Sequence, residues 1–396
     1  MGNVQGGRKK DTSYRKTFVL RQQTPMIHFQ YADRGAIIRA SEFKPKLDKF
    51  LVKKKGGENH MPGNWLLEQT DENKPAALNY KVRIWIAGKT EISQKTEYTK
   101  ELNNWKELHH GTKNNLKDKK TDLRNKYPKS QINGMYFGNM GNDTTTCKKT
   151  IFYTENIYVE IQSFVTGLLD YISDNMAEFM LVTNFGTRQS KGFGSFALMD
   201  DTIDPCNILS DNHYEYIYGI VKDDKKGVNH EDKMLNVMKG GINRSYDCET
   251  RQYKDKKYIK GYIQRRYLDV CEKKQTGSDK AFMKSKIIKA QNPRWIEKKC
   301  DNYESYSEFE YVRALLGITD RIVFRDRDKV RNGTVRIKNK DIERFGSAIQ
   351  ITVWGNYIFL IMKDEEYIKN ILDKEFTFSY MDNSKKIIKD RIKTPA

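Results

Sequence analysis

The stretch TNFGTRQSKGFGSF, Thr183 to Phe196, places three glycines and two basic residues between an apolar helix pattern and an apolar strand pattern. Glycine adopts positive φ without steric cost and lets a phosphate approach the backbone N–H groups closely. Arginine and lysine add positive charge, arginine as a planar fork and lysine as a point charge. The segment therefore predicts a phosphate-binding loop formed by Gly186, Arg188, Lys191, Gly192 and Gly194.

The position of this loop narrows the kind of site that it can form. A dinucleotide-binding fingerprint and a P-loop both follow a strand, whereas this loop follows a helix pattern. The complete Walker pattern G-x-x-x-x-G-K-[ST] is also absent from the sequence. A tight helix-to-strand turn without a ligand is the alternative interpretation of the glycines.

Patterns on either side of the loop predict the order of the neighbouring elements. The predicted strands are 16–31, 79–89, 151–164 and one that begins at 195, and the predicted helices begin at an N-cap Ser41 and at 165. The order βαββαβ is typical of an α+β domain of the ferredoxin-like or RRM-like kind. We expect this domain to cover residues 1–210, with the lysine-rich, polar segment 90–149 as a surface insertion.

Residues 211–396 predict a second α+β domain, rich in helix and then closed by a β-hairpin. A strand is expected over 214–221, helices within 230–300 and over 308–318, and a final helix over 366–378. The hairpin is expected over 342–363, because two apolar runs flank a turn at Gly355-Asn356.

The composition favours a polyanionic partner. The 396 residues include 72 Lys plus Arg against 52 Asp plus Glu, a formal charge of +20. Such a surplus attracts nucleic acid or an anionic membrane surface, although a generally lysine-rich host proteome is an alternative explanation. No apolar run is long enough to span a membrane, no signal peptide is visible, and the five scattered cysteines indicate reduced thiols. We expect a cytoplasmic protein without a cofactor or a metal.

A second basic segment, TPMIHFQYADRGAIIRASEFKPKL, leads into the first predicted helix. A helix N-terminus beside basic side chains is a natural site for a phosphate. A solvated basic surface is the alternative. The candidate RNA-binding residues of this segment are Arg34, Arg39, Lys44 and Lys46.

These two segments together resemble the RAMP superfamily of CRISPR effector subunits. Residues 186–194, GTRQSKGFG, fit the family's loop G-x-(R/S)-x-x-(K/R)-G-F-G after the second helix of a ferredoxin-like domain. Thr24-Pro25, Arg39 and residues 43–47 are similar to the start of the Cmr-type (type III-B) large subunit that sits near the guide RNA 3′ end. Residues 343–348, ERFGSA, resemble the R-F-x-S-P of the C-terminal RAMP domain. Pro45 and Asp48 depart from the family's glycine and arginine.

The resemblance implies a non-catalytic subunit of a type III CRISPR-Cas ribonucleoprotein in antiviral defence. Its partners would be guide RNA (crRNA), target RNA and other Cas subunits, and its second domain would be a degenerate second RAMP unit. In some relatives an aspartate after the first strand cleaves RNA, and a histidine nearby acts as general base. Asp33 and His28 are the corresponding candidates, with a turn residue and a strand residue as the plainer interpretations.

Two alternatives therefore stay open beside the RNA-gripping subunit. One is a metal-assisted endoribonuclease that uses Asp33, and the other is a basic module that docks on an acidic protein. Aromatic residues such as Tyr158 can stack bases on a sheet surface, although we interpret most of them as packing residues.

Overall fold

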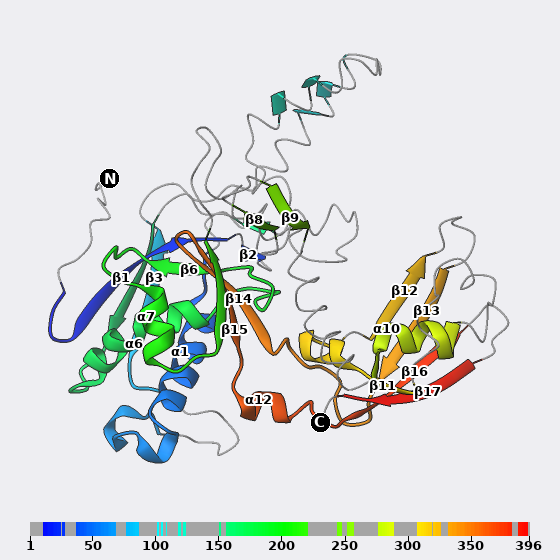
Figure 1. Ribbon diagram of the computed structural model, residues 1–396. Coiled ribbons are helices and arrows are strands. Elements are labelled where there is room, and N and C mark those ends of the chain that lie inside the picture. Colours follow the sequence, from blue (N-terminus) through cyan, green and yellow to red (C-terminus); the bar gives the residue numbers. More distant parts are fainter. Residues whose placement is uncertain are drawn as a thin grey trace. The chain divides into compact units, whose positions relative to one another are not determined.

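The computed structural model is a mixed α+β protein with several sheets (Figure 1). It divides into a first unit, Met1–Gly240 with Gln350–Ile361, and a second unit, Gly241–Ile349 with Met362–Ala396. The residues that the structure describes are 11–24, 26–27, 37–68, 77–86, 101–102, 104–105, 108, 118–119, 122–123, 150–151, 156–220, 244–247, 252–256, 276–288, 307–318, 320–325, 332–381 and 387–394.

The first unit contains a four-stranded antiparallel sheet in the order β3-β5-β1-β6. Its strands are β1 (Arg15–Gln22), β3 (Lys81–Ile86), β5 (Ile157–Gln162) and β6 (Phe196–Leu198). The helices α1 (Ala40–Lys54) and α6 (Leu168–Val182) pack against one face of this sheet, because alternate strand residues share a core with both helices. Along the chain these elements follow the order β-α-β-β-α-β.

The predicted apolar stripe of α6 is confirmed. All six side chains expected on one face are buried, namely Leu168, Leu169, Ile172, Met176, Phe179 and Met180. The expected N-cap of α1 was wrong, since the helix begins at Ala40 and Arg39 is the N-cap, without a side-chain cap hydrogen bond. Ser41 lies inside the first turn instead, and Pro45 is the sixth residue of the helix, where it leaves the Ser41 carbonyl without its usual i+4 N–H donor.

A three-stranded sheet in the order β14-β15-β7 completes the first unit. It consists of β7 (Tyr216–Ile220), β14 (Ile349–Trp354) and β15 (Tyr357–Met362). The predicted hairpin is confirmed, and Gly355 supplies its turn with a φ of 56°. Trp354, Phe359 and Ile361 belong to the same buried core as the first sheet.

Smaller elements of the first unit connect these layers. They are β2 (Met26–Ile27), β4 (Thr150–Ile151), α7 (Pro205–Asp211) and 3-10 turns at Glu58–His60 and Gly63–Trp65. The expected insertion 90–149 lies almost wholly outside the described residues.

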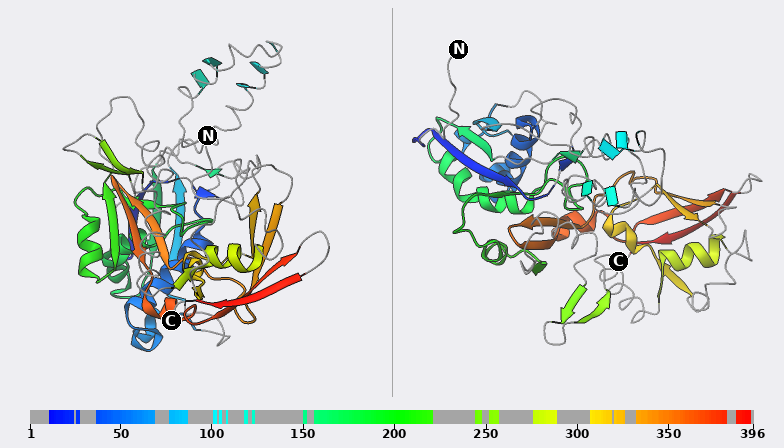
Figure 2. Two further views of the ribbon diagram at one scale, coloured as in Figure 1. Left: turned by 45° about the vertical axis from the view of Figure 1, so that its right-hand side comes forward. Right: turned by 90° about the horizontal axis from the view of Figure 1, so that it is seen from above.

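The second unit contains a six-stranded mixed sheet in the order β10-β11-β17-β16-β13-β12. The strands are β10 (Thr276–Ser278), β11 (Glu308–Glu310), β12 (Arg321–Arg325), β13 (Asn332–Lys338), β16 (Glu375–Met381) and β17 (Ile387–Lys393). Figure 2 shows the long β16–β17 and β12–β13 pairs from two sides. Tyr311, Phe376 and Phe378 form the centre of a separate buried core.

The helices among the described residues of this unit are short. They are α10 (Asp279–Phe282), continued by a π-helix over Met283–Ile288, a 3-10 helix over Val312–Leu316, and α12 (Glu365–Lys369). A further antiparallel pair joins β8 (Arg244–Asp247) to β9 (Gln252–Lys256).

One predicted helix was wrong here, and the predicted helix 366–378 was too long, since α12 ends at Lys369. Residues 308–318 form β11 and a 3-10 turn, because 308–310 pair with 276–278. Residues 375–378 begin β16, since Phe376 and Phe378 alternate into the core.

Candidate nucleic-acid interface

The Gly-rich loop lies between α6 and β6, as predicted. Gly186, Gly192 and Gly194 have φ values of 80°, 82° and 68°, so the left-handed conformations expected of them are confirmed. The loop closes where the Phe185 N–H donates to the Gly194 carbonyl at 2.9 Å. Phe185 is fully buried and stacks on Phe43 of α1, which fixes the base of the loop.

Asn184 is the buried centre of the loop. Its Nδ2 donates to the carbonyls of Gln189 and Ile351, both at 2.7 Å. Its Oδ1 accepts from Ser195 Oγ at 3.0 Å and from Thr352 Oγ1 at 3.4 Å. All four hydrogen-bonding positions of the amide are thus used, which makes the loop one rigid structure with β14.

Glu42, in the first turn of α1, joins that helix to the loop. Its Oε1 accepts from the Gly186 N–H at 2.9 Å, from Lys46 Nζ at 2.7 Å and from Gln189 Nε2 at 3.3 Å. The Gly192 N–H donates to the Gln189 carbonyl at 3.1 Å. The expectation that these glycine N–H groups are bare was therefore wrong, because the protein itself supplies their acceptors.

Removing the Glu42 carboxylate is expected to loosen this junction. We expect Glu42→Ala to lower the free energy of unfolding by about 1–3 kcal/mol, because a half-buried N–H and a lysine lose their shared acceptor. Urea unfolding followed by circular dichroism measures this loss. Glu42→Gln keeps an oxygen for the Gly186 N–H and is expected to lose less; equal losses in the two variants would contradict the role of that hydrogen bond.

Lys44 and Lys46 have partners inside the first unit. Lys44 Nζ donates to Asp48 Oδ2 at 2.7 Å and to the Leu78 carbonyl at 2.8 Å. Burial raises the pKa of Asp48, although the neighbouring Lys44 favours the carboxylate. Lys46 Nζ binds Glu42 and the Asn184 carbonyl, and burial lowers the pKa of Lys46. Lys46 thus stabilises the site from within, whereas Lys44 joins α1 to the segment that precedes β3.

Arg39 and Arg188 are placed differently, because both are exposed. Neither guanidinium has a hydrogen bond or an ion pair to another described residue. Arg188 has a φ of 58°, a conformation that costs an L-residue about 1–2 kcal/mol. Partial desolvation by neighbouring atoms lowers the pKa of Arg188, which stays cationic at neutral pH. Glu42 connects the segments that carry the two arginines. It lies three residues after Arg39, and it accepts hydrogen bonds from Gly186 and Gln189, which stand before and after Arg188 in the loop.

Lys191 lies on the same loop as Arg188. Its N–H donates to the Arg188 carbonyl at 2.9 Å, and it forms a parallel bridge to Ile351 of β14. Of the predicted residues near α1, Lys46 contacts the loop segment through the Asn184 carbonyl and through Glu42, whereas the side chain of Lys44 bonds to Asp48 and Leu78 outside the loop. Arg34, Asp33 and His28 lie outside the described residues.

Sequence reasoning missed Glu42 and Asn184. The spacing of Glu42 and Lys46 is a readable i,i+4 ion pair on a helix, so a local signal existed. Asn184 offered none, since Ile351 is 167 positions away.

The described residues offer neither a cluster of metal ligands nor a membrane-spanning helix. Among the described residues, no three His, Cys, Asp or Glu side chains gather closely enough to hold a metal ion. No helix in the described part of the chain is long and apolar enough to cross a membrane.

Comparison with known protein families assigns the chain. The model of the Cmr1 N-terminal domain matches residues 13–268, and that of the Cmr1 C-terminal domain matches residues 256–396. The chain belongs to the Cmr1 family. No curated protein and no solved structure matches it.

Membership of the Cmr1 family confirms the resemblance to RAMP subunits of type III-B CRISPR systems. A Cmr1 protein is a subunit of a multi-subunit type III-B effector that binds crRNA and acts in antiviral defence. Both the Gly-rich loop and the basic segment lie within the match to the Cmr1 N-terminal domain.

Proposed function

We propose that this Cmr1 chain grips guide RNA, or the duplex of guide and target, by its phosphates at the junction of the Gly-rich loop and α1. The observation that carries the proposal is Arg188, an exposed cation held in a left-handed conformation at the tip of a rigid loop. Strained backbone of this kind concentrates at ligand-binding sites. A planar guanidinium suits a phosphate, which it can bind through two parallel hydrogen bonds.

Arg39 and Lys191 would complete the phosphate contact. Arg39 precedes the first turn of α1, where no N-cap side chain occupies the N–H groups. The helix dipole and those N–H groups favour an anion at this end. Lys44 and Lys46 would contribute positive potential from behind, because their ammonium groups already have protein partners.

We also propose that the β3-β5-β1-β6 sheet with α1 and α6 is a ferredoxin-like RAMP domain. The order of elements along the chain and the antiparallel pairings support this assignment. In such a domain the Gly-rich loop joins the second helix to the last strand, which is its place here.

The test is RNA binding by the double variant Arg188→Ala plus Lys191→Ala across a salt series. We expect affinity for guide RNA to fall several-fold or more, and the slope of log K against log salt to decrease by about one to two. Fluorescence anisotropy with labelled guide RNA measures both quantities.

A matched variant controls for the loss of two positive charges. Lys369→Ala plus Lys393→Ala removes two exposed lysines of the second unit that pair with carboxylates. We expect it to bind RNA nearly as the unaltered chain does. Equal binding by the loop variant would refute the phosphate contact, and a wild-type affinity that barely depends on salt would favour a protein-docking module.

A further inference from the structure

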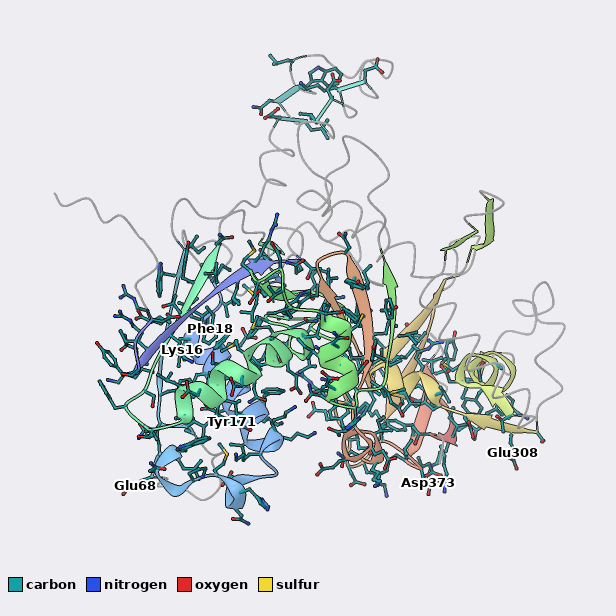
Figure 3. The ribbon with its side chains drawn as sticks, turned by 60° about the vertical axis from the view of Figure 1, so that its left-hand side comes forward. Lys16, Phe18, Glu68, Tyr171, Glu308 and Asp373 are labelled. Atoms are coloured by element: carbon teal, nitrogen blue, oxygen red, sulfur yellow. The ribbon has the colours of Figure 1, made fainter. Side chains whose placement is uncertain are left out.

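The β3-β5-β1-β6 sheet has a second face, opposite to the helices. Figure 3 marks Lys16 and Phe18 of β1 and Tyr171 of α6, and Lys16 Nζ donates to Asp170 of that helix at 2.9 Å. Lys16, Phe18 and the buried Leu20 therefore lie on the helix side of β1. Successive strand residues point to opposite faces, so Thr17 and Val19 project away from the helices. The same alternation applies to β3 and β5, whose Ile84 and Val159 pack in the helix-side core.

Two aromatic rings lie side by side on this second face. Trp85 of β3 and Tyr158 of β5 are register partners, with ring centroids 5.6 Å apart and planes 14° from parallel. Neither residue belongs to the core between sheet and helices. The Arg83 guanidinium lies 5.5 Å from the centroid of the Trp85 ring. The rings therefore form a flat, partly exposed surface with a cation beside it.

Positive charge surrounds the two rings. Lys81, Arg83 and Arg21 are exposed on the same face and have no hydrogen bond or ion pair from their side chains to a described residue. One carboxylate, Glu160, shares this face of the described strands, and it is 2% exposed and lies 3.9 Å from Arg15 Nε. The face thus carries a net positive charge that complements a polyanion.

This combination distinguishes one kind of nucleic acid. Aromatic rings bind nucleic acid by stacking on unpaired bases, and every base has a face that can stack. In a duplex the bases stack on each other and are out of reach of a flat sheet. Exposed arginines next to the rings can meanwhile contact the phosphates that connect the stacked bases.

We propose that Trp85 and Tyr158 form a stacking platform for an unpaired stretch of RNA, with Arg83 and Arg21 contacting its backbone. The proposal rests on the RNA binding proposed above but adds a second site, made of different residues on the second face of the sheet. It assigns single-stranded RNA as the ligand class of this face, whereas the Gly-rich loop contacts phosphates of paired or unpaired strands alike.

The test compares Trp85→Ala and Tyr158→Ala in the full chain with Trp85→Phe and Tyr158→Phe. A uridine-rich single strand carrying 2-aminopurine is the probe, and a duplex of equal length is its counterpart. We expect each alanine variant to bind the single strand about tenfold more weakly, and the phenylalanine variants to restore most of the affinity. Quenching of 2-aminopurine on binding should also be lost with alanine and retained with phenylalanine.

The salt slope separates this site from the Gly-rich loop. We expect it to stay at the wild-type value in the aromatic variants, because no phosphate contact is removed. Tyr218→Ala, which removes a 48% exposed ring from the β14-β15-β7 sheet, is the matched control and should bind as wild type. Unchanged single-strand affinity in folded alanine variants, or an equal loss for the duplex, would overturn the platform.

The two proposals fail independently. Weak binding by the aromatic variants with normal binding by the Arg188 and Lys191 variant would leave the platform as the RNA site and refute the loop. Normal RNA binding by the aromatic variants, together with loss of their assembly with other subunits, would overturn the platform and identify this face as a protein contact.

Discussion

Gly194→Ala is expected to destabilise the first unit strongly. A Cβ at Gly194 would overlap the carbonyl oxygen of Phe185 and lie 2.8 Å from its carbonyl carbon. Neither atom can move away, because Phe185 is buried and its N–H is bonded to Gly194 itself. Overpacking and the left-handed φ of 68° together predict a loss of about 3 kcal/mol or more in the free energy of unfolding.

Gly355→Ala is the matched control for this prediction. Gly355 has a similar φ of 56°, but no atom lies within 4 Å of a Cβ placed there. It therefore isolates the backbone strain, expected to be about 1–2 kcal/mol. Urea unfolding by circular dichroism measures both variants. Similar losses at the two glycines would mean that the contact with Phe185 can relax.

Asn184→Asp is expected to have a comparably large effect with a distinct pH dependence. The carboxylate would face the carbonyl oxygens of Gln189 and Ile351, which now accept hydrogen bonds from Nδ2. Ser195 and Thr352 can still donate to one carboxylate oxygen, but the other oxygen would have no donor, and a buried charge without a compensating partner is expected to cost about 3–5 kcal/mol at neutral pH. Asn175→Asp is the comparison. The Asn175 amide is half-buried and donates to the Tyr171 carbonyl, so this variant should lose much less stability than Asn184→Asp.

The sign of the pH effect follows from the same geometry. Burial beside two carbonyls raises the folded-state pKa of the new aspartate above its ordinary value of about 3.9. Stability is then greatest below that ordinary value and falls as the pH rises toward the folded-state pKa, by about 1.4 kcal/mol per pH unit. The difference between variant and wild type, measured from about pH 5 to about pH 7, should grow with pH. A difference that is flat or shrinks would contradict a buried carboxylate.

Local patterns predicted those elements whose apolar periodicity was clear. The stripe of α6 and the hairpin around Gly355 follow from spacing and turn chemistry alone. Residues 375–378 were mistaken for the end of a helix, although Phe376, Phe378 and Tyr380 alternate as a strand with one buried face does. Residues 308–310 had no comparable signal, because their strand exists through pairing with a segment 32 positions earlier.

The candidate site shows the same limit. Its glycine conformations were predictable, since residue type restricts φ locally. The internal pairing of the lysines was predictable only in part. The pairs Lys44–Asp48 and Lys46–Glu42 have helical spacing, whereas the Asn184 carbonyl that also binds Lys46 is 138 positions away. Asn184 itself looked like a loop residue and is 1% exposed.

The hairpin β14–β15 has a consequence for how the chain is made. The loop that carries Arg188 is bonded to Ile351, so the first unit cannot be completed while translation is still between Gly240 and Gln350. These positions are 350 − 240 = 110 residues apart, which corresponds to roughly 5–20 s of synthesis at about 5–20 residues per second. During that interval the nascent first unit exposes the apolar surface that Trp354, Phe359 and Ile361 later cover. A ribosome-bound chaperone, or early association with RNA, would protect the growing polypeptide from aggregation until its last strands arrive.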